Sequence, residues 1–125
     1  NNIDCELFSF TFDILKYYNL SNLVISRAGS SALAELLNCR IPFISIPLRT
    51  SSENHQLKNA EYFVKKGFGL MIEENNIENK LFDLLQSIHK DKSILDLIKK
   101  NQSKHCDKNV FTIIKKEIIK LFYEN

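Results

Sequence analysis

Residues 23 to 35 constrain this chain most, because they predict a buried strand, a glycine turn and the start of a helix. The continuous apolar run Leu23 to Ile25 is typical of a strand buried on both faces, and Gly29 permits a turn in which a Cβ would crowd the backbone. Ser30 and Ser31 then open a helix whose first amides have no partner within it. These amides and the positive end of the helix dipole predict a phosphate site.

Glu35 lies four residues after Ser31 and therefore on the same face of the predicted helix, about one turn deeper. A carboxylate at this place can accept two hydrogen bonds from a ribose diol. The alternative is a solvated acid near the helix start, which the dipole favours. The opposite, core-facing side carries apolar residues: Ala32, Leu33, Leu36 and Leu37.

Apolar strand-like runs alternate with helical patterns, which predicts an α/β fold of parallel strands joined by crossover helices. The predicted strands are Cys5–Phe10, Asn22–Ser26, Pro42–Pro47 and Gly69–Ile72. The predicted helices are Asp13–Tyr18, Ser31–Cys39, Asn54–Lys66, Ile77–His89, Ser93–Lys104 and Asn109–Tyr123. Ligands bind such sheets at the carboxyl ends of the strands, here the turns that begin at Phe10, Arg27 and Leu48. Gly67 and Gly69 are interpreted as helix-end and turn residues, not as a phosphate loop.

Composition narrows the class of protein. A chain of 125 residues, 44% of them hydrophobic, favours one folded domain, and a net charge of +2 with lysines mixed among acids does not indicate a nucleic-acid partner. No apolar run approaches the roughly 20 residues that span a bilayer, and the polar start suggests a chain internal to a longer gene product.

The separated Cys5, Cys39 and Cys106 favour reduced thiols in a cytoplasmic protein. His105–Cys106 lacks a second ligand pair, so no metal or cofactor is expected.

A second candidate site is the polar segment from Leu48 to Ala60, which leaves a predicted strand and enters a helix. His55, Gln56 and Asn59 offer directional donors and acceptors without a large net charge. Such groups can distinguish one sugar hydroxyl configuration from another. The alternative is that these polar residues only cap the helix start.

These two sites, in this order, resemble the carboxyl-terminal half of the MurG-type glycosyltransferases, and the resemblance covers nearly the whole chain. It rests on Arg-Ala-Gly-Ser-Ser with a following Glu at 27–35, His-Gln-x-x-Asn-Ala at 55–60, Phe-Thr-Phe-Asp at 10–13 and a proline-containing strand at 42–47. Members of this family transfer N-acetylglucosamine from UDP-N-acetylglucosamine to lipid I, which makes the lipid II of peptidoglycan. The resemblance implies an incomplete Rossmann-like carboxyl-terminal half of a GT-B enzyme, with residues 1–125 forming a partial donor nucleotide-sugar-binding domain.

The resemblance also implies roles for the residues that would meet the nucleotide. Phe10 would pack beside the uracil and the main chain of Thr11 would read its edge, although the family often has a branched apolar residue in place of Thr11. Glu35 would hold the ribose hydroxyls. The helix start would face the diphosphate through Gly29, Ser30 and Ser31.

For the sugar, the resemblance implies that His55 and Gln56 contact the N-acetylglucosamine hydroxyls and that Asn59 supports their loop. Arg27 would either brace its turn or lie near the diphosphate. No catalytic residue is expected in this chain, because the family's presumed base belongs to the amino-terminal half. In the intact enzyme, a donor diphosphate at a helix dipole would have the charge on its UDP leaving group stabilised without a required metal. The resemblance implies that attack on the anomeric carbon then inverts its configuration.

The same resemblance implies missing parts. The acceptor half and the first strands of this half are not in these residues, so the sheet would lack its middle and would tend to associate. The lipid I acceptor, and peripheral contact with the inner face of a bacterial plasma membrane, would come through the missing half. The final helix, Asn109–Tyr123, would cross to that half and be displaced here. The alternative is that it packs into its own domain's core.

Two other functions stay open at this point. The chain can be a stand-alone donor-binding subunit of a two-component UDP-N-acetylglucosamine transferase, although that family usually has His where this chain has Arg27. It can also be a non-catalytic α/β interaction domain in which Glu35 is merely exposed. Binding of UDP separates this last alternative from the others.

Overall fold

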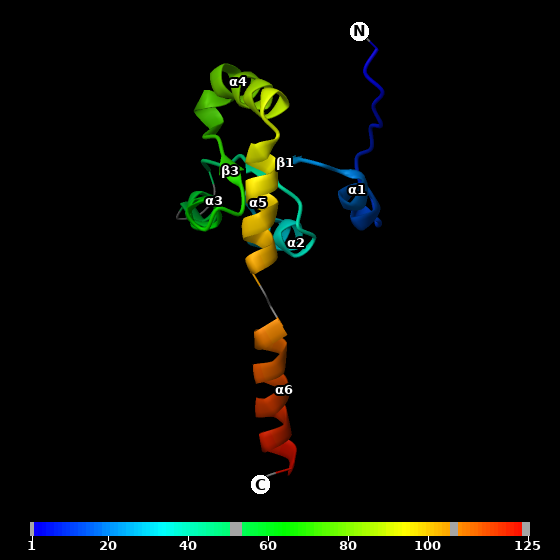
Figure 1. Ribbon diagram of the computed structural model, residues 1–125, viewed down its shortest axis with the longest axis vertical. Coiled ribbons are helices and arrows are strands. Elements are labelled where there is room, and N and C mark those ends of the chain that lie inside the picture. The colour runs from blue at the N-terminus through cyan, green and yellow to red at the C-terminus, as the bar shows by residue number, and fades with distance from the viewer. Residues whose placement is uncertain (1, 51–53, 106–107, 124–125) are drawn as a thin grey trace.

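The computed structural model describes residues 2–50, 54–105 and 108–123, and it is an α/β arrangement of short parallel strands and helices (Figure 1). Each predicted helix is present, with ends that lie within two residues of the prediction. The elements in chain order are α1 Ile14–Leu20, β1 Val24–Ser26, α2 Ser30–Asn38, β2 Phe43–Ser45, α3 His55–Lys65, β3 Leu70–Met71, a 3₁₀ turn η2 Glu74–Asn76, α4 Ile77–Lys90, α5 Ser93–Lys104 and α6 Lys108–Tyr123.

The three strands form one parallel sheet with the order β1-β2-β3. Val24 pairs with Phe43 at one end of the first ladder, and Ile44 pairs with Leu70 in the second. The parallel prediction is confirmed, although each strand is shorter than its apolar run. β2 is central, and all three of its residues are buried.

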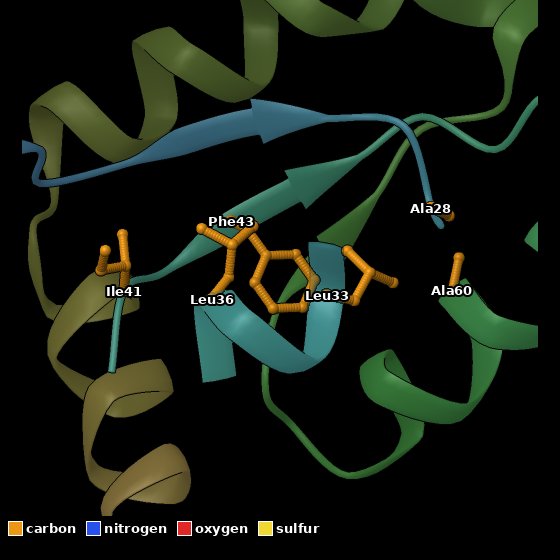
Figure 2. Packing of buried hydrophobic residues seen from close by; sticks show 6 residues of the cluster. All are labelled: Ala28, Leu33, Leu36, Ile41, Phe43 and Ala60. Carbon is orange, nitrogen blue, oxygen red and sulfur yellow. The ribbon is translucent and has the colours of Figure 1, made fainter. Parts of the chain in front are cut away.

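Two hydrophobic clusters lie on opposite faces of the sheet, because successive residues of a strand point to opposite sides. Phe43 belongs to the cluster that α2 and α3 cover, and Figure 2 shows its ring beside Leu33 and Leu36. Ile44, the next residue, belongs to the cluster that α4 and α5 cover, together with Ile88. The burial of Leu33, Leu36 and Leu37 confirms the predicted core-facing side of α2.

The predicted strand at Cys5–Phe10 is wrong. The described residues before α1 contain no strand, and Ile3, Leu7 and Phe10 are 83%, 91% and 70% exposed. Figure 1 shows this segment apart from the sheet. No other strand in the described ranges lies beside it, so its N–H and C=O groups have no ladder to join, and its apolar side chains have no face to cover.

Gly67 and Gly69 differ in purpose. Gly67 ends α3 with a φ of +76°, and Phe68 N donates to Phe63 O at 3.0 Å across the turn, as in a helix C-terminal glycine motif. A Cβ on Gly69 would overlap the ring of Phe43, so this glycine allows the close approach of a core aromatic side chain. The helix-end interpretation is therefore confirmed for Gly67, whereas packing explains Gly69.

The last helix, α6, presents apolar side chains to solvent. All of its residues from 113 to 123 are exposed, including Ile113 and Phe122, and Figure 1 shows the helix extending away from the sheet. Packing of these side chains into the domain's own core, one of the two alternatives, is thus not observed. No helix in the described part of the chain is long and apolar enough to span a membrane.

Gln102 of α5 joins the amino ends of two strands. Its side chain is buried, and its Nε2 donates to Ile41 O at 2.9 Å and to Phe68 O at 2.8 Å. These carbonyls precede β2 and β3. Because unpaired buried carbonyls are costly, this single amide lets α5 close the sheet at that end.

We expect Gln102→Leu to lower the free energy of unfolding by about 1–3 kcal/mol, because two buried carbonyls lose their donor. The measurement is urea unfolding followed by circular dichroism. Gln86→Leu on the exposed side of α4 is the matched control and should change stability by less than about 0.5 kcal/mol. Equal losses in the two variants would contradict a closing role for Gln102.

Candidate functional site

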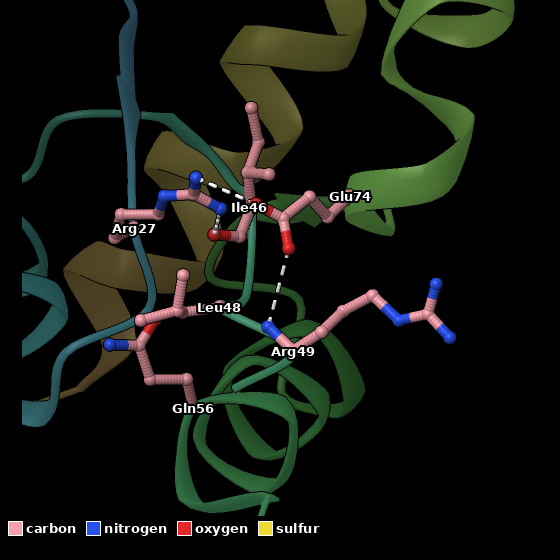
Figure 3. Close-up of polar contacts among 6 residues, drawn as sticks. All are labelled: Arg27, Ile46, Leu48, Arg49, Gln56 and Glu74. Atoms are coloured by element: carbon pink, nitrogen blue, oxygen red, sulfur yellow. Dashed lines mark hydrogen bonds and ion pairs between the residues drawn. The ribbon is translucent and has the colours of Figure 1, made fainter. Parts of the chain in front are cut away.

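Polar residues from three strand ends meet at the carboxyl edge of the sheet. Arg27 follows β1, Leu48 and Arg49 follow β2, and Glu74 follows β3. The carboxyl ends of parallel strands share one edge, where open α/β sheets bind ligands. Figure 3 shows these residues close together, with Gln56 of α3 beside them.

Glu74 connects the three strand ends. Arg27 Nη2 pairs with Glu74 Oε1 at 2.9 Å, and the Arg49 amide donates to Glu74 Oε2 at 3.4 Å. Arg27 also donates from Nη1 to Ile46 O at 3.4 Å. These contacts are of the kind that the bracing role of Arg27 requires.

Glu74 is not among the residues predicted from the sequence. The predicted ligand-binding turns begin at Phe10, Arg27 and Leu48, whereas Glu73 and Glu74 follow the predicted strand Gly69–Ile72. The same rule about carboxyl ends, applied to that strand, would have found both carboxylates. The Arg27 guanidinium, and after it the Arg49 amide, hold the pKa of Glu74 below its usual value.

Gln56 and Asn59 tie α3 to the neighbouring strand ends. Gln56 Oε1 accepts a hydrogen bond from the Leu48 amide at 2.9 Å, and Asn59 Nδ2 donates to Ala28 O at 3.3 Å. His55, the first residue of α3, is exposed on the same helix. The side-chain oxygen of Gln56 therefore holds a loop, while Asn59 holds the turn that leads into α2.

The turn at Gly29 corrects one expectation. Gly29 caps α2 with φ −64° and ψ 138°, an extended conformation that any residue adopts, and a Cβ placed there meets no atom within 4 Å in the part of the chain that the structure describes. Crowding by the backbone is therefore not the reason for this glycine, because the turn leaves open space above it. Ser30 begins α2, and no side-chain cap bonds to its first turn.

Glu35 and the residues before α1 lie further from this network. Glu35 is exposed on α2. The pKa of Tyr18 on α1 is raised, first by the partial burial of Tyr18 and then by the negative charge of Glu35. Thr11 Oγ1 accepts from the Asp13 amide at 3.1 Å, and Phe10 packs against Phe12 with 4.9 Å between ring centres. The structure thus gathers Arg27, Gln56 and Asn59 at the edge, but it leaves Phe10 and Thr11 in a separate segment.

A cleft of about 280 Å³ opens beside Glu74 at the ends of β2 and β3. Its apolar lining residues are Pro47, Leu48 and Leu57, and its polar ones are Arg49, Asn54, Glu73 and Glu74. An apolar surface with a few polar groups is typical of small-molecule sites, and this cleft is near the lower end of their size range.

Among the residues that the structure describes, no group of His, Cys, Asp and Glu can hold a metal ion. Cys5 and Cys39 are free thiols, and Cys106 lies outside the described residues.

A parallel sheet with helices on both faces, and with a cleft and polar braces at its carboxyl edge, defines an α/β domain of the kind that binds ligands at that edge. Comparison with known families makes this more specific. The model of the glycosyltransferase family 28 C-terminal domain matches residues 1–118, and the chain belongs to this family.

Two curated relatives carry the same name, UDP-N-acetylglucosamine--N-acetylmuramyl-(pentapeptide) pyrophosphoryl-undecaprenol N-acetylglucosamine transferase. The protein of Pelagibacter ubique is 37% identical over an alignment 125 positions long, which covers 99% of this chain and 35% of the relative. That of Rickettsia typhi is 38% identical over 96 residues, 76% of this chain and 25% of the relative. The chain thus spans about a third or less of these relatives.

The crystal structure of Acinetobacter baumannii MurG has a similar fold. It superposes with a TM-score of 0.71 at 20% identity, over 89% of this chain and 33% of that one. At this level of identity the likeness supports the fold alone. It agrees with the incomplete GT-B half that the resemblance implied.

We expect Arg27→Met to raise the pKa of Glu74 toward its usual value, because the guanidinium is the largest cause of its lowering. A ¹³C NMR titration of the carboxylates measures this. Because folding lowers the pKa of Glu74, its ion pair with Arg27 contributes fully to stability above the pKa that Glu74 has in the unfolded chain. This contribution is lost as the pH falls through the pKa that Glu74 has in the folded chain.

Arg49→Met is the matched control for this titration. It keeps the main-chain amide that donates to Glu74, so the pKa should move less than in Arg27→Met. A larger rise in Arg49→Met than in Arg27→Met would show that the ion pair with Arg27 is not the dominant interaction.

Proposed function

We propose that this chain binds the UDP-N-acetylglucosamine donor, as the carboxyl-terminal part of a glycosyltransferase that moves N-acetylglucosamine to lipid I and so forms lipid II. The observation that carries the proposal is the uncapped start of α2 at the carboxyl edge, with open space above Gly29. Membership of the glycosyltransferase family 28 C-terminal domain, and the names of the curated relatives, support the choice of donor.

The diphosphate is proposed to lie against Gly29, Ser30 and Ser31. Amides at a helix start combine with the positive dipole end to favour negative charge. Because a Cβ at Gly29 would meet no described residue within 4 Å, the glycine is explained best by a ligand that approaches the backbone there. The same amides would stabilise charge that develops on the UDP leaving group.

The remaining donor contacts follow the family motifs. Glu35, exposed on α2, is proposed to hold the ribose hydroxyls, and His55 and Gln56 to meet the N-acetylglucosamine. Phe10 and Thr11 are proposed to meet the uracil. Because their segment lies apart from the sheet, this contact requires it to move toward α2.

The acceptor side of the reaction is proposed to lie outside these residues. A longer protein would supply the base that deprotonates the lipid I hydroxyl. The attack of this hydroxyl oxygen on the anomeric carbon would displace UDP and invert the configuration of that carbon. Contact with the cytoplasmic face of a bacterial plasma membrane would also come from that part. No nucleic acid has a role in this proposal.

The first test is calorimetric titration of UDP-N-acetylglucosamine into the full chain and into Glu35→Ala. We expect the variant to bind at least tenfold more weakly, since a charge-assisted acceptor contributes about 1.5–3 kcal/mol. Its melting temperature should be unchanged because Glu35 is exposed. Glu61→Ala, an exposed acid on α3, is the control and should bind normally. No binding of UDP by the unmodified chain would favour the non-catalytic interaction domain instead.

The second test uses two glycines. Gly29→Ala should leave stability unchanged or slightly raised and should weaken donor binding, because its Cβ enters only the space proposed for the diphosphate. Gly69→Ala should do the opposite and lower stability, because its Cβ overlaps Phe43. Native affinity in Gly29→Ala would remove the diphosphate from this turn.

A further inference from the structure

We propose that Glu74 is a positioning residue that locks the β1–α2 turn and residues 46–50, which follow β2, into one preformed edge for the donor. The identity of the ligand rests on the proposed function above. The locking rests on contacts of Glu74 alone, because its carboxylate reaches the residues after β1 and β2 from the end of β3.

The geometry of the carboxylate suits a bridge. Its two oxygens have different partners: Oε1 faces the Arg27 guanidinium at 2.9 Å, and Oε2 accepts from the Arg49 amide at 3.4 Å. Arg27 lies two residues before Gly29, and Arg49 directly follows the residue that Gln56 holds. A shift of Glu74 is therefore transmitted both to the proposed diphosphate turn and to the proposed sugar loop.

Stability alone does not account for this arrangement. The side chains of Arg27 and Glu74 are 49% and 31% exposed, and pairs at such exposure contribute little to folding. The same pair can matter more for binding, because a ligand that meets ordered loops does not have to supply their ordering entropy. Glu74 also lines the cleft at this edge, so it borders space that a ligand can enter.

Figure 3 shows how the neighbouring residues are arranged around Glu74. Glu74 lies between Arg27 on one side and the main chain of Arg49 on the other, while the Arg49 guanidinium extends away from it. A neutral amide at position 74 would keep the size of the side chain but lose its charge. It would also offer only one acceptor oxygen in place of two.

The experiment compares Glu74→Gln with Glu78→Gln, an exposed carboxylate in the first turn of α4 that does not line the cleft. Titration of UDP-N-acetylglucosamine should show about threefold to tenfold weaker binding in Glu74→Gln and no change in Glu78→Gln. The melting temperatures of both should match the unmodified chain. Hydrogen exchange at the Arg49 amide should accelerate only in Glu74→Gln.

A double-mutant cycle isolates the pair. Once Arg27→Met has removed the guanidinium, adding Glu74→Gln should weaken binding by less than it does in the unmodified chain. Equal affinity in Glu74→Gln and Glu78→Gln, or full additivity with Arg27→Met, would overturn the positioning role.

Failure of the proposed function gives a different result. If the unmodified chain does not bind UDP-N-acetylglucosamine, the choice of donor is wrong. Exchange at the Arg49 amide, and the amide chemical shifts of residues 29–31 in Glu74→Gln, then decide the locking without a ligand. Unchanged exchange and unchanged shifts would reject it.

Discussion

The central position of β2 between two parallel neighbours is the constraint on which the rest of this structure depends. Helices cover both faces of this parallel sheet, and because successive residues of a strand point to opposite faces, Phe43 and Ile44 of β2 belong to separate clusters on opposite sides of the sheet. Helices α2 and α3 cover one face, and α4 and α5 cover the other. Because all three strands run the same way, their carboxyl ends meet at one edge, and their loops form the candidate site.

Short strands leave their ends to be held by side chains. At the amino edge, Gln102 satisfies the carbonyls that precede β2 and β3. At the carboxyl edge, Gln56, Asn59 and Glu74 bond to the main chain next to β1 and β2. The first edge is closed by a buried amide and the second by partly exposed groups. Rigidity without full burial suits an edge that a ligand must reach.

The glycines show how packing and binding are divided in this chain. Gly69 allows a core ring to approach, and Gly67 provides the positive φ that ends α3. Gly29 has neither purpose within the described structure, since its backbone is ordinary and the space above it is open. Because the described fold does not require a glycine at position 29, a ligand that approaches the backbone there is the best explanation for it. The start of α2 is therefore the centre of the proposed function.

The sequence by itself determined the helices, three of the four predicted strands and their parallel direction, because apolar periodicity and alternation are local properties of the chain. It also determined the family, through the motifs at residues 27–35 and 55–60. Only the tertiary structure decided that residues 5–10 form no strand, because a strand needs hydrogen bonds to a neighbouring strand. Tertiary structure also decided that Gln56 holds Leu48 and that Glu74 pairs with Arg27, 47 residues away. Such contacts depend on which strand ends meet in space, and no local pattern records them.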